Sequence, residues 1–276
     1  MELCVSMWSV HRKFYHENWT TIDFLRFCRD IDVRRVELLD LFWRDAAEEV
    51  PDVLRFIREN DMEVAAYAVA NDFVQADAAK RADALASVRR GLDFARQFHA
   101  PVVRVFAGNL KEGYDFESAF LYIVEGLKAA VEGIEPEITL ALENHGLLAG
   151  RGEQIKRVIR EVGSSRLRST FDVGNFYLVG QQPMEALAEL SGVLSHIHVK
   201  DFVKSEAGLR ATTGEYFSGV TCGEGIVPFP DILSMLKVID YSGTLSIEYE
   251  GDGDELDGVR QSLAFLRNLL NESVPV

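Results

Sequence analysis

Four segments in the second half of the chain carry a carboxylate or an imidazole where an apolar run ends. They are TLALENH (139–145), RSTFDVG (168–174), LSHIHVK (194–200) and TLSIEYE (244–250). Alternate side chains of a strand face opposite sides, so the apolar residues of each segment would share one face. The opposite face would then present Glu143, Asp172, His198 and Glu248.

Three carboxylates and an imidazole that face one interior are costly to bury, because the charges repel and each group loses its hydration. A divalent cation removes this conflict, since carboxylate oxygens and imidazole nitrogens are ligands of Mn²⁺, Mg²⁺, Co²⁺ and Zn²⁺. The pattern therefore favours a site for one divalent metal ion. The alternative is a solvated polar opening with ion pairs and no metal.

A metal ion beside carboxylates suits the removal of a proton from a carbon next to a carbonyl group. The ion stabilises the negative oxygen of the resulting enediolate. One carboxylate takes the proton and another group returns it. The face that receives the returned proton decides between epimerisation and isomerisation.

The segments that would position these groups belong to a regular alternation along the whole chain. Helical patterns, with apolar residues three and four apart, separate the strand-like segments, and the sixth of these helices (183–190) is short. Repeated βα units predict a parallel sheet, and eight of them in 276 residues predict a single (β/α)8 TIM barrel over residues 1–276. The strand-like segments are 3–8, 35–40, 64–70, 102–108, 139–145, 168–174, 194–200 and 244–250.

This barrel is favoured over an open doubly wound sheet, because no GxGxxG motif follows the first strand. Active sites in such barrels lie at the C-terminal ends of the strands, where the four candidate ligands would stand. Residues 202–225 are the one long stretch without clear periodicity. We expect a long loop there, either a lid or binding loop on the active-site face or an exposed insertion without a role.

Five motifs, in this order, resemble those of the xylose isomerase-like TIM-barrel family of sugar isomerases and epimerases. They are LENHG, TFDVGN, HIHVKD, GEGIVPFPDIL and LSIEYEG. The resemblance implies one divalent metal, most often Mn²⁺, held by the four residues named above. It also implies that Glu143 and Glu248 act as acid and base on a metal-bound substrate. The expected activity is that of an isomerase or epimerase of a sugar or sugar-derived carbonyl compound.

Other functions on the same barrel remain open. A lyase that dehydrates a ring compound such as dehydroshikimate or an inosose also begins with proton removal beside a carbonyl. DNA repair is disfavoured, because endonuclease IV uses three metal ions and many His ligands, whereas this chain has six His in total. A binding protein without turnover is a further alternative, against which the intact set of four ligands argues.

Several residues near the predicted barrel mouth are candidates for substrate binding. Ketose epimerases of the family often carry a His three residues after the metal-binding Asp, where this chain has Asn175, which disfavours a free ketohexose. Glu37 and Arg104 share inward parity and predict either an ion pair inside the barrel or a substrate contact. The full set of substrate candidates is His145, Lys200, Asn175, Arg104, Asn71 and Arg210.

Residues that flank these candidates are expected to support the site. His196 would lie one layer deeper than His198, as a hydrogen-bonded core residue or as a residue that supports a metal ligand. Asn144, with the opposite parity to Glu143, is expected to secure the strand end. The aromatic residues at strand ends would line the pocket or pack in the core, and these are Trp8, Phe73 and Phe106.

Composition and charge narrow the range of partners. The formal net charge of −15, from 44 acidic and 29 basic residues, disfavours nucleic acid and anionic membranes and leaves a small sugar-like molecule as the expected partner. Three cysteines without a CxxC pair are typical of a reducing compartment. We see no secretory signal and no run of eighteen apolar residues, so we expect a cytoplasmic protein. Family likeness also suggests a homo-oligomer.

Overall fold

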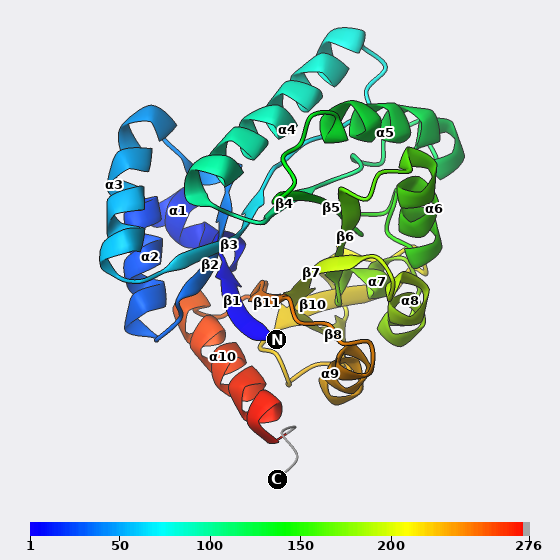
Figure 1. Ribbon diagram of the computed structural model, residues 1–276. Coiled ribbons are helices and arrows are strands. Elements are labelled where there is room, and N and C mark those ends of the chain that lie inside the picture. The colour runs from blue at the N-terminus through cyan, green and yellow to red at the C-terminus, as the bar shows by residue number, and fades with distance from the viewer. Residues whose placement is uncertain (273–276) are drawn as a thin grey trace.

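Eight parallel strands close into a barrel in the computed structural model, which describes residues 1–272 (Figure 1). The strands follow one another around the barrel in chain order, and the last pairs with the first. Each overlaps one predicted segment, which confirms the (β/α)8 fold. The strands are β1 (Glu2–Ser6), β2 (Arg35–Leu39), β3 (Glu63–Ala68), β4 (Val102–Val105), β5 (Thr139–Glu143), β6 (Leu167–Asp172), β7 (Leu194–Val199) and β11 (Thr244–Ile247).

Helices surround the barrel as an outer ring (Figure 1). Among residues 1–272, none of them is long and apolar enough to cross a membrane. Two short 3-10 helices, η1 (Met7–Val10) and η2 (Asp40–Phe42), follow the first two strands. The α-helices are α1 (His11–Glu17), α2 (Thr21–Asp30), α3 (Ala46–Glu59), α4 (Ala78–Phe98), α5 (Phe116–Val131), α6 (Gly152–Val162), α7 (Asn175–Leu178), α8 (Pro183–Leu190), α9 (Phe229–Val238) and α10 (Glu255–Glu272).

The apolar side chains of the strands pack with those of the helices in one large core. Leu140 and Leu142 of β5 and Ile197 of β7 are fully buried in it, as strand alternation predicts. On the opposite side of the strands, Ala66, Val102 and Ala141 form a small separate cluster. The outward face of each strand therefore packs in the large core, and the inward face carries this small apolar cluster together with the polar groups.

The register of the strands brings the inward polar residues side by side. Asp172 of β6 pairs with His198 of β7, and His198 pairs with Ser246 of β11. The β6–β7 register shifts by one residue just before this point, because Ser195 is extra on β7. Such irregularities re-aim side chains next to functional sites.

Residues 201–220 leave the barrel and form a second, antiparallel sheet, which corrects the prediction of a long loop over 202–225. We call it the excursion sheet. No helical pattern separates its strands, so the alternation of strand and helix that marks the barrel strands is missing from this stretch of the sequence. It consists of β8 (Asp201–Ser205), β9 (Leu209–Arg210) and β10 (Tyr216–Val220), in the order β8-β10-β9.

The excursion sheet has its own small apolar cluster, made by Phe202, Phe217, Ala211 and Leu178. Leu178 belongs to α7, so the sheet packs on the segment that directly follows the end of β6. The excursion is therefore an ordered part of the C-terminal face of the barrel.

Candidate metal centre

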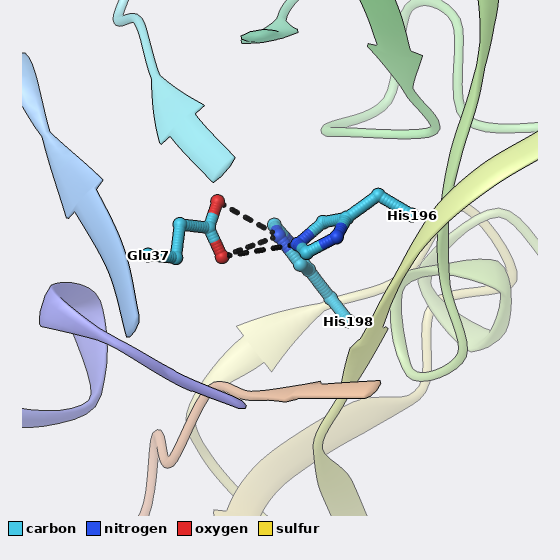
Figure 2. Close-up of side chains that lie close together, drawn as sticks. All are labelled: Glu37, His196 and His198. Carbon is cyan, nitrogen blue, oxygen red and sulfur yellow. Dashed lines mark hydrogen bonds and ion pairs between the residues drawn. The ribbon is translucent and has the colours of Figure 1, made fainter. Parts of the chain in front are cut away.

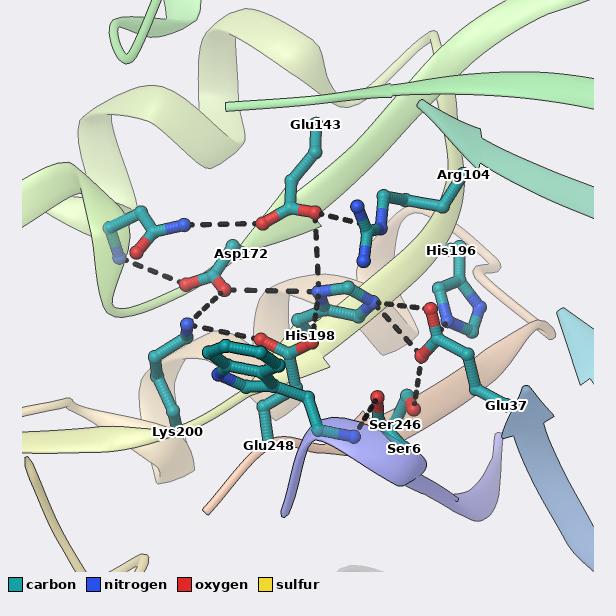
Figure 3. A network of polar contacts seen from close by, with 12 residues as sticks. Ser6, Glu37, Arg104, Glu143, Asp172, His196, His198, Lys200, Ser246 and Glu248 are labelled. Carbon is teal, nitrogen blue, oxygen red and sulfur yellow. Dashed lines mark hydrogen bonds and ion pairs between the residues drawn. The ribbon is translucent and has the colours of Figure 1, made fainter. Parts of the chain in front are cut away.

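Glu143, Asp172, His198 and Glu248 converge at the C-terminal end of the barrel (Figure 3). One carboxylate oxygen of each acid and one ring nitrogen of His198 all lie within 4.8 Å of one another. All four side chains are buried. They come from β5, β6, β7 and the residue after β11, and strand alternation had placed all four on the inner face.

The distances within this cluster suit a single ion. His198 Nδ1 lies 3.4 Å from Glu248 Oε1, 3.6 Å from Glu143 Oε2 and 3.9 Å from Asp172 Oδ2. Within residues 1–272, Glu143 Oε2 and His198 Nδ1 are buried without a hydrogen-bond partner of good geometry. Uncommitted oxygen and nitrogen lone pairs around one point are the donor set of a divalent cation, so these residues fit the metal predicted from the sequence.

Glu37 of β2 contacts the opposite edge of the His198 ring (Figures 2 and 3). Its carboxylate lies 3.1 Å from His198 Nε2 and 3.3 Å from His196 Nε2, and it accepts a hydrogen bond from Ser246 Oγ at 2.8 Å. His196 is fully buried, which confirms it as a hydrogen-bonded core residue. Burial alone would raise the pKa of Glu37, but the two histidines outweigh it and lower that pKa well below its usual range.

Arg104 of β4 forms an ion pair inside the barrel, as one of the two expectations had it, but its partner is Glu143 and not Glu37. Arg104 Nε lies 3.2 Å from Glu143 Oε2, and the guanidinium carbon stands 4.1 Å from the ring centroid of Phe106. Parity gives the side of a strand that a residue faces but not its neighbour across a barrel, because tilt and stagger decide that. Burial raises the pKa of Glu143, but His198 and Arg104 overcome this effect and hold it well below its usual range.

Lys200 is surrounded by carboxylates. Its Nζ lies 2.9 Å from Asp172 Oδ2, 3.1 Å from Glu248 Oε2 and 2.9 Å from Glu250 Oε1. Burial would lower the pKa of Lys200, but these acids raise it, so the side chain is an ammonium. Glu250 also accepts a hydrogen bond from Trp8 Nε1 at 3.0 Å. The sequence had given Glu250 no role, although it shares inward parity with Glu248.

Two asparagines secure the cluster. Asn144 bonds the backbone of Asp172 in both directions, at 2.8 and 3.0 Å, which confirms that it ties down the strand end. Asn175 donates its side-chain N–H to Glu143 Oε1 at 3.2 Å and its backbone N–H to Asp172 Oδ1 at 2.9 Å. Asn175 therefore orients the proposed ligands.

Burial raises the pKa of the Asp172 carboxyl group to about 7.

A cavity of about 190 Å³ opens directly on the cluster. An outer cavity of about 630 Å³ continues beyond it, and the two share Trp8, His145, Lys200 and Glu250. Ligand pockets typically measure about 300–1,000 Å³, so both parts together are large enough for a sugar-sized molecule. Sequence reasoning missed four residues of the inner wall that no polar motif marks, namely Leu39, Asp40, Leu41 and Ala70.

Three of the remaining candidates line these cavities. Phe106 lines the inner one, and the ring of His145 packs 4.1 Å from its ring, centroid to centroid. Burial lowers the pKa of His145, which favours the neutral imidazole. Arg210 of the excursion sheet lines the outer cavity.

Asn71 and Phe73 line neither cavity, which corrects Asn71 as a substrate candidate and gives Phe73 the second of its two expected roles, packing in the core. The amide of Asn71 bonds the backbone of Phe106 in both directions, at 2.7 and 2.9 Å, so it joins the ends of β3 and β4 and is not available to a substrate. Phe73 is buried in the core and packs against Gly126, where a Cβ atom would come within 2.4 Å of its ring. Phe73 therefore does not wall the pocket.

Residues 25–269 match the family model described as xylose isomerase-like TIM barrel. The chain belongs to this family. The inosose dehydratase of Mesomycoplasma hyopneumoniae is 29% identical over 112 residues, which cover 37% of each chain. The matches cover 45% and 37% of the length of the curated relatives, so the chain spans less than half of each.

Solved structures share the fold of this xylose isomerase-like barrel. A structure of the IolI protein with a bound zinc atom has a TM-score of 0.81 at 15% identity and covers all of both chains. A structure of L-ribulose 3-epimerase has a TM-score of 0.75 at 17% identity and covers 99% of this chain and 95% of that one. Identities this low establish a shared architecture and do not extend to the reaction, which depends on the residues of the site.

Proposed function

We propose that this protein is a metal-dependent isomerase or epimerase of a sugar or sugar-derived carbonyl compound. The observation that carries the proposal is the convergence of Glu143, Asp172, His198 and Glu248, two of which, Glu143 and Glu248, line a cavity. These four would hold one divalent ion. Mn²⁺ is the first candidate, and Mg²⁺, Co²⁺ and Zn²⁺ suit the same donor set.

The bound ion would polarise a substrate carbonyl and so acidify the neighbouring C–H group. Glu143 and Glu248 both line the inner cavity and are placed to exchange a proton with that carbon. Arg104 and His198 keep Glu143 ionised, which is the state that a base needs. Glu248 would deliver a second proton to the substrate, and proton exchange with solvent would then restore both carboxyl groups.

The other cavity residues would orient the substrate and limit its contact with water. Lys200 and His145 offer an ammonium and a neutral imidazole to substrate hydroxyls from the boundary between the two cavities. Trp8 and Phe106 provide apolar walls, which suit the carbon face of a sugar. Arg210 stands over the outer cavity, where it would meet the end of the substrate farthest from the cluster.

A dehydratase is the second candidate, and the match to inosose dehydratase favours it. Loss of water begins with the same proton removal, but a proton must then reach the departing hydroxyl group. Lys200 and His145 line both cavities and would be the candidate donors of that proton.

The test is deuterium uptake from D2O by NMR, with Mn²⁺ and a panel of ketoses, sugar phosphates, inososes and dehydroshikimate. We expect deuterium at the carbon beside the carbonyl of one substrate, together with a new isomer. Loss of water would identify the dehydratase. A metal-loaded protein that exchanges no deuterium into any compound of the panel would contradict both candidates.

Variants test the roles in the same assay. Glu143→Gln and Glu248→Gln should each slow exchange about 10²–10⁴-fold, the usual contribution of a general acid or base. Glu255→Gln is the matched control, because Glu255 is also a buried glutamate but bonds Arg12 and Lys13 outside the cluster. It should leave exchange unchanged.

A further inference from the structure

The ring of His198 lies between the carboxylate cluster and Glu37 (Figure 3). Its Nδ1 edge faces the cluster, and its Nε2 edge lies 3.1 Å from each oxygen of Glu37. We propose that Glu37 is a positioning residue, which accepts the Nε2–H of His198 and so presents Nδ1 to the metal. This inference rests on the proposed metal centre.

The argument begins with the proton on the ring. An ionised carboxylate only accepts hydrogen bonds, so its contact with Nε2 requires the hydrogen on that nitrogen. In a neutral imidazole the lone pair then belongs to Nδ1, which has no hydrogen-bond partner of good geometry within residues 1–272. A carboxylate that fixes the tautomer of a metal-binding histidine typically contributes 10–100-fold in metal affinity.

Glu37 is itself held in place by other buried groups. Ser246 donates to Glu37 Oε2 at 2.8 Å (Figure 3), and His196 Nε2 lies 3.3 Å from the same oxygen (Figure 2). The other nitrogen of His196 lies 2.8 Å from Thr244 Oγ1, which fixes the orientation of that ring. Three donors on one fully buried carboxylate leave it little freedom to turn away from His198.

A second metal ion is the competing explanation, because Glu37, His196 and His198 also lie within metal-ligand reach of one another. The geometry favours hydrogen bonds. The contacts of Glu37 with the two rings measure 3.1 and 3.3 Å, and all three side chains are completely buried. A metal ion bound by these atoms would have to separate side chains that already hydrogen-bond each other.

The test compares the Zn²⁺ affinity of the wild type, Glu37→Gln, Ser246→Ala and Glu255→Gln by chelator competition. We expect one ion per wild-type chain and a 10–100-fold loss of affinity in Glu37→Gln. Ser246→Ala should lose less, because it keeps the Glu37–His198 contact. Glu255→Gln should bind like the wild type, since its buried glutamate lies elsewhere.

A second readout separates positioning from a general loss of structure. Long-range ¹H–¹⁵N NMR of the Zn²⁺-loaded wild type should show His198 with a strongly hydrogen-bonded Nε2–H, and Glu37→Gln, whose neutral amide accepts more weakly, should shift that signal toward weaker hydrogen bonding. If Glu37→Gln does not fold, the wild-type spectrum decides, and an Nε2–H exposed to solvent exchange overturns the proposal.

The outcomes separate this proposal from the proposed function. Unchanged affinity and an unchanged Nε2–H signal in Glu37→Gln overturn the role of Glu37 alone. Two ions per wild-type chain, with one lost in Glu37→Gln, make Glu37 a ligand and also overturn it. A wild type that binds no Zn²⁺, Mn²⁺, Co²⁺ or Mg²⁺ overturns both proposals.

Discussion

At the barrel mouth, acidic side chains outnumber the basic ones that contact them. Two permanent cations, Arg104 and Lys200, stand among the acids of the cluster, with His198 at the centre. The acids outnumber these cations, which favours the binding of one more positive charge. The five carboxylates are Glu37, Glu143, Asp172, Glu248 and Glu250.

Metal affinity should rise with pH. Asp172 has a pKa raised to about 7 by burial, and the neighbouring acids raise the pKa of His198 although burial opposes them. Both groups hold protons below pH 7, and a metal ion must displace those protons. We expect at least about tenfold weaker Mn²⁺ binding at pH 6 than at pH 8. Calorimetric titration with Mn²⁺ at both pH values measures this difference in affinity. Equal affinities would contradict the assigned protonation states.

For single residues, the sequence predicts the strand face that a side chain occupies better than it predicts the residue that the side chain contacts. Alternation placed Glu143, Asp172 and His198 on one side, because the period of a strand is fixed. It did not predict that Glu37 contacts His198 or that Asn71 bonds the backbone of Phe106. Those contacts depend on the height of each residue along a tilted strand, which is set by the stagger of the closed barrel.

Among the elements, the excursion sheet is joined to the barrel by a tight turn. The carboxylate of Asp201, at the start of β8, accepts backbone N–H groups from Gly223, Gly225 and Val227 at 2.9 to 3.0 Å. Asp201 directly follows Lys200, so this turn also fixes the strand end that carries the ammonium. The GEG motif is therefore explained by backbone packing around one carboxylate.

Gly225→Ala should destabilise the protein by about 1–3 kcal/mol, the usual cost of overpacking. A Cβ at Gly225 would come within 2.2 Å of Asp201 Oδ1 and 2.3 Å of the Phe202 carbonyl oxygen. Gly192→Ala is the matched control, because a Cβ there meets nothing within 4 Å. Urea unfolding measures both. Equal stability of the two variants would show that the turn relaxes easily.

Among the elements, sequence patterns predicted the barrel strands but not the excursion sheet. The eight barrel strands were predicted because each is an apolar run between helical patterns that repeat many times. The excursion sheet was not, because no helical pattern separates its strands and Leu209–Arg210 has only two residues. Its turns at Gly208 and Gly214 have positive φ angles, which glycine adopts readily but which also occur in irregular loops.

In the whole molecule, barrel closure assembles one site from residues more than a hundred positions apart. Glu143 and Glu248 stand on strands that β6 and β7 separate, so they approach the cavity from different sides. The same architecture supports epimerases and a dehydratase, so the fold sets where chemistry occurs and the cavity sets which reaction. A cytoplasmic location and a homo-oligomer stay predictions from the sequence.

The most direct test of the metal centre is anomalous diffraction from crystals of the protein loaded with Zn²⁺. We predict one peak per chain, about 2.0–2.2 Å from a carboxylate oxygen of Glu143, Asp172 and Glu248 and about 2.0–2.1 Å from His198 Nδ1. Glu37 should lie outside the coordination sphere. A peak at any other position, or none at the cluster in fully loaded crystals, would contradict the assignment of these four residues as the metal ligands.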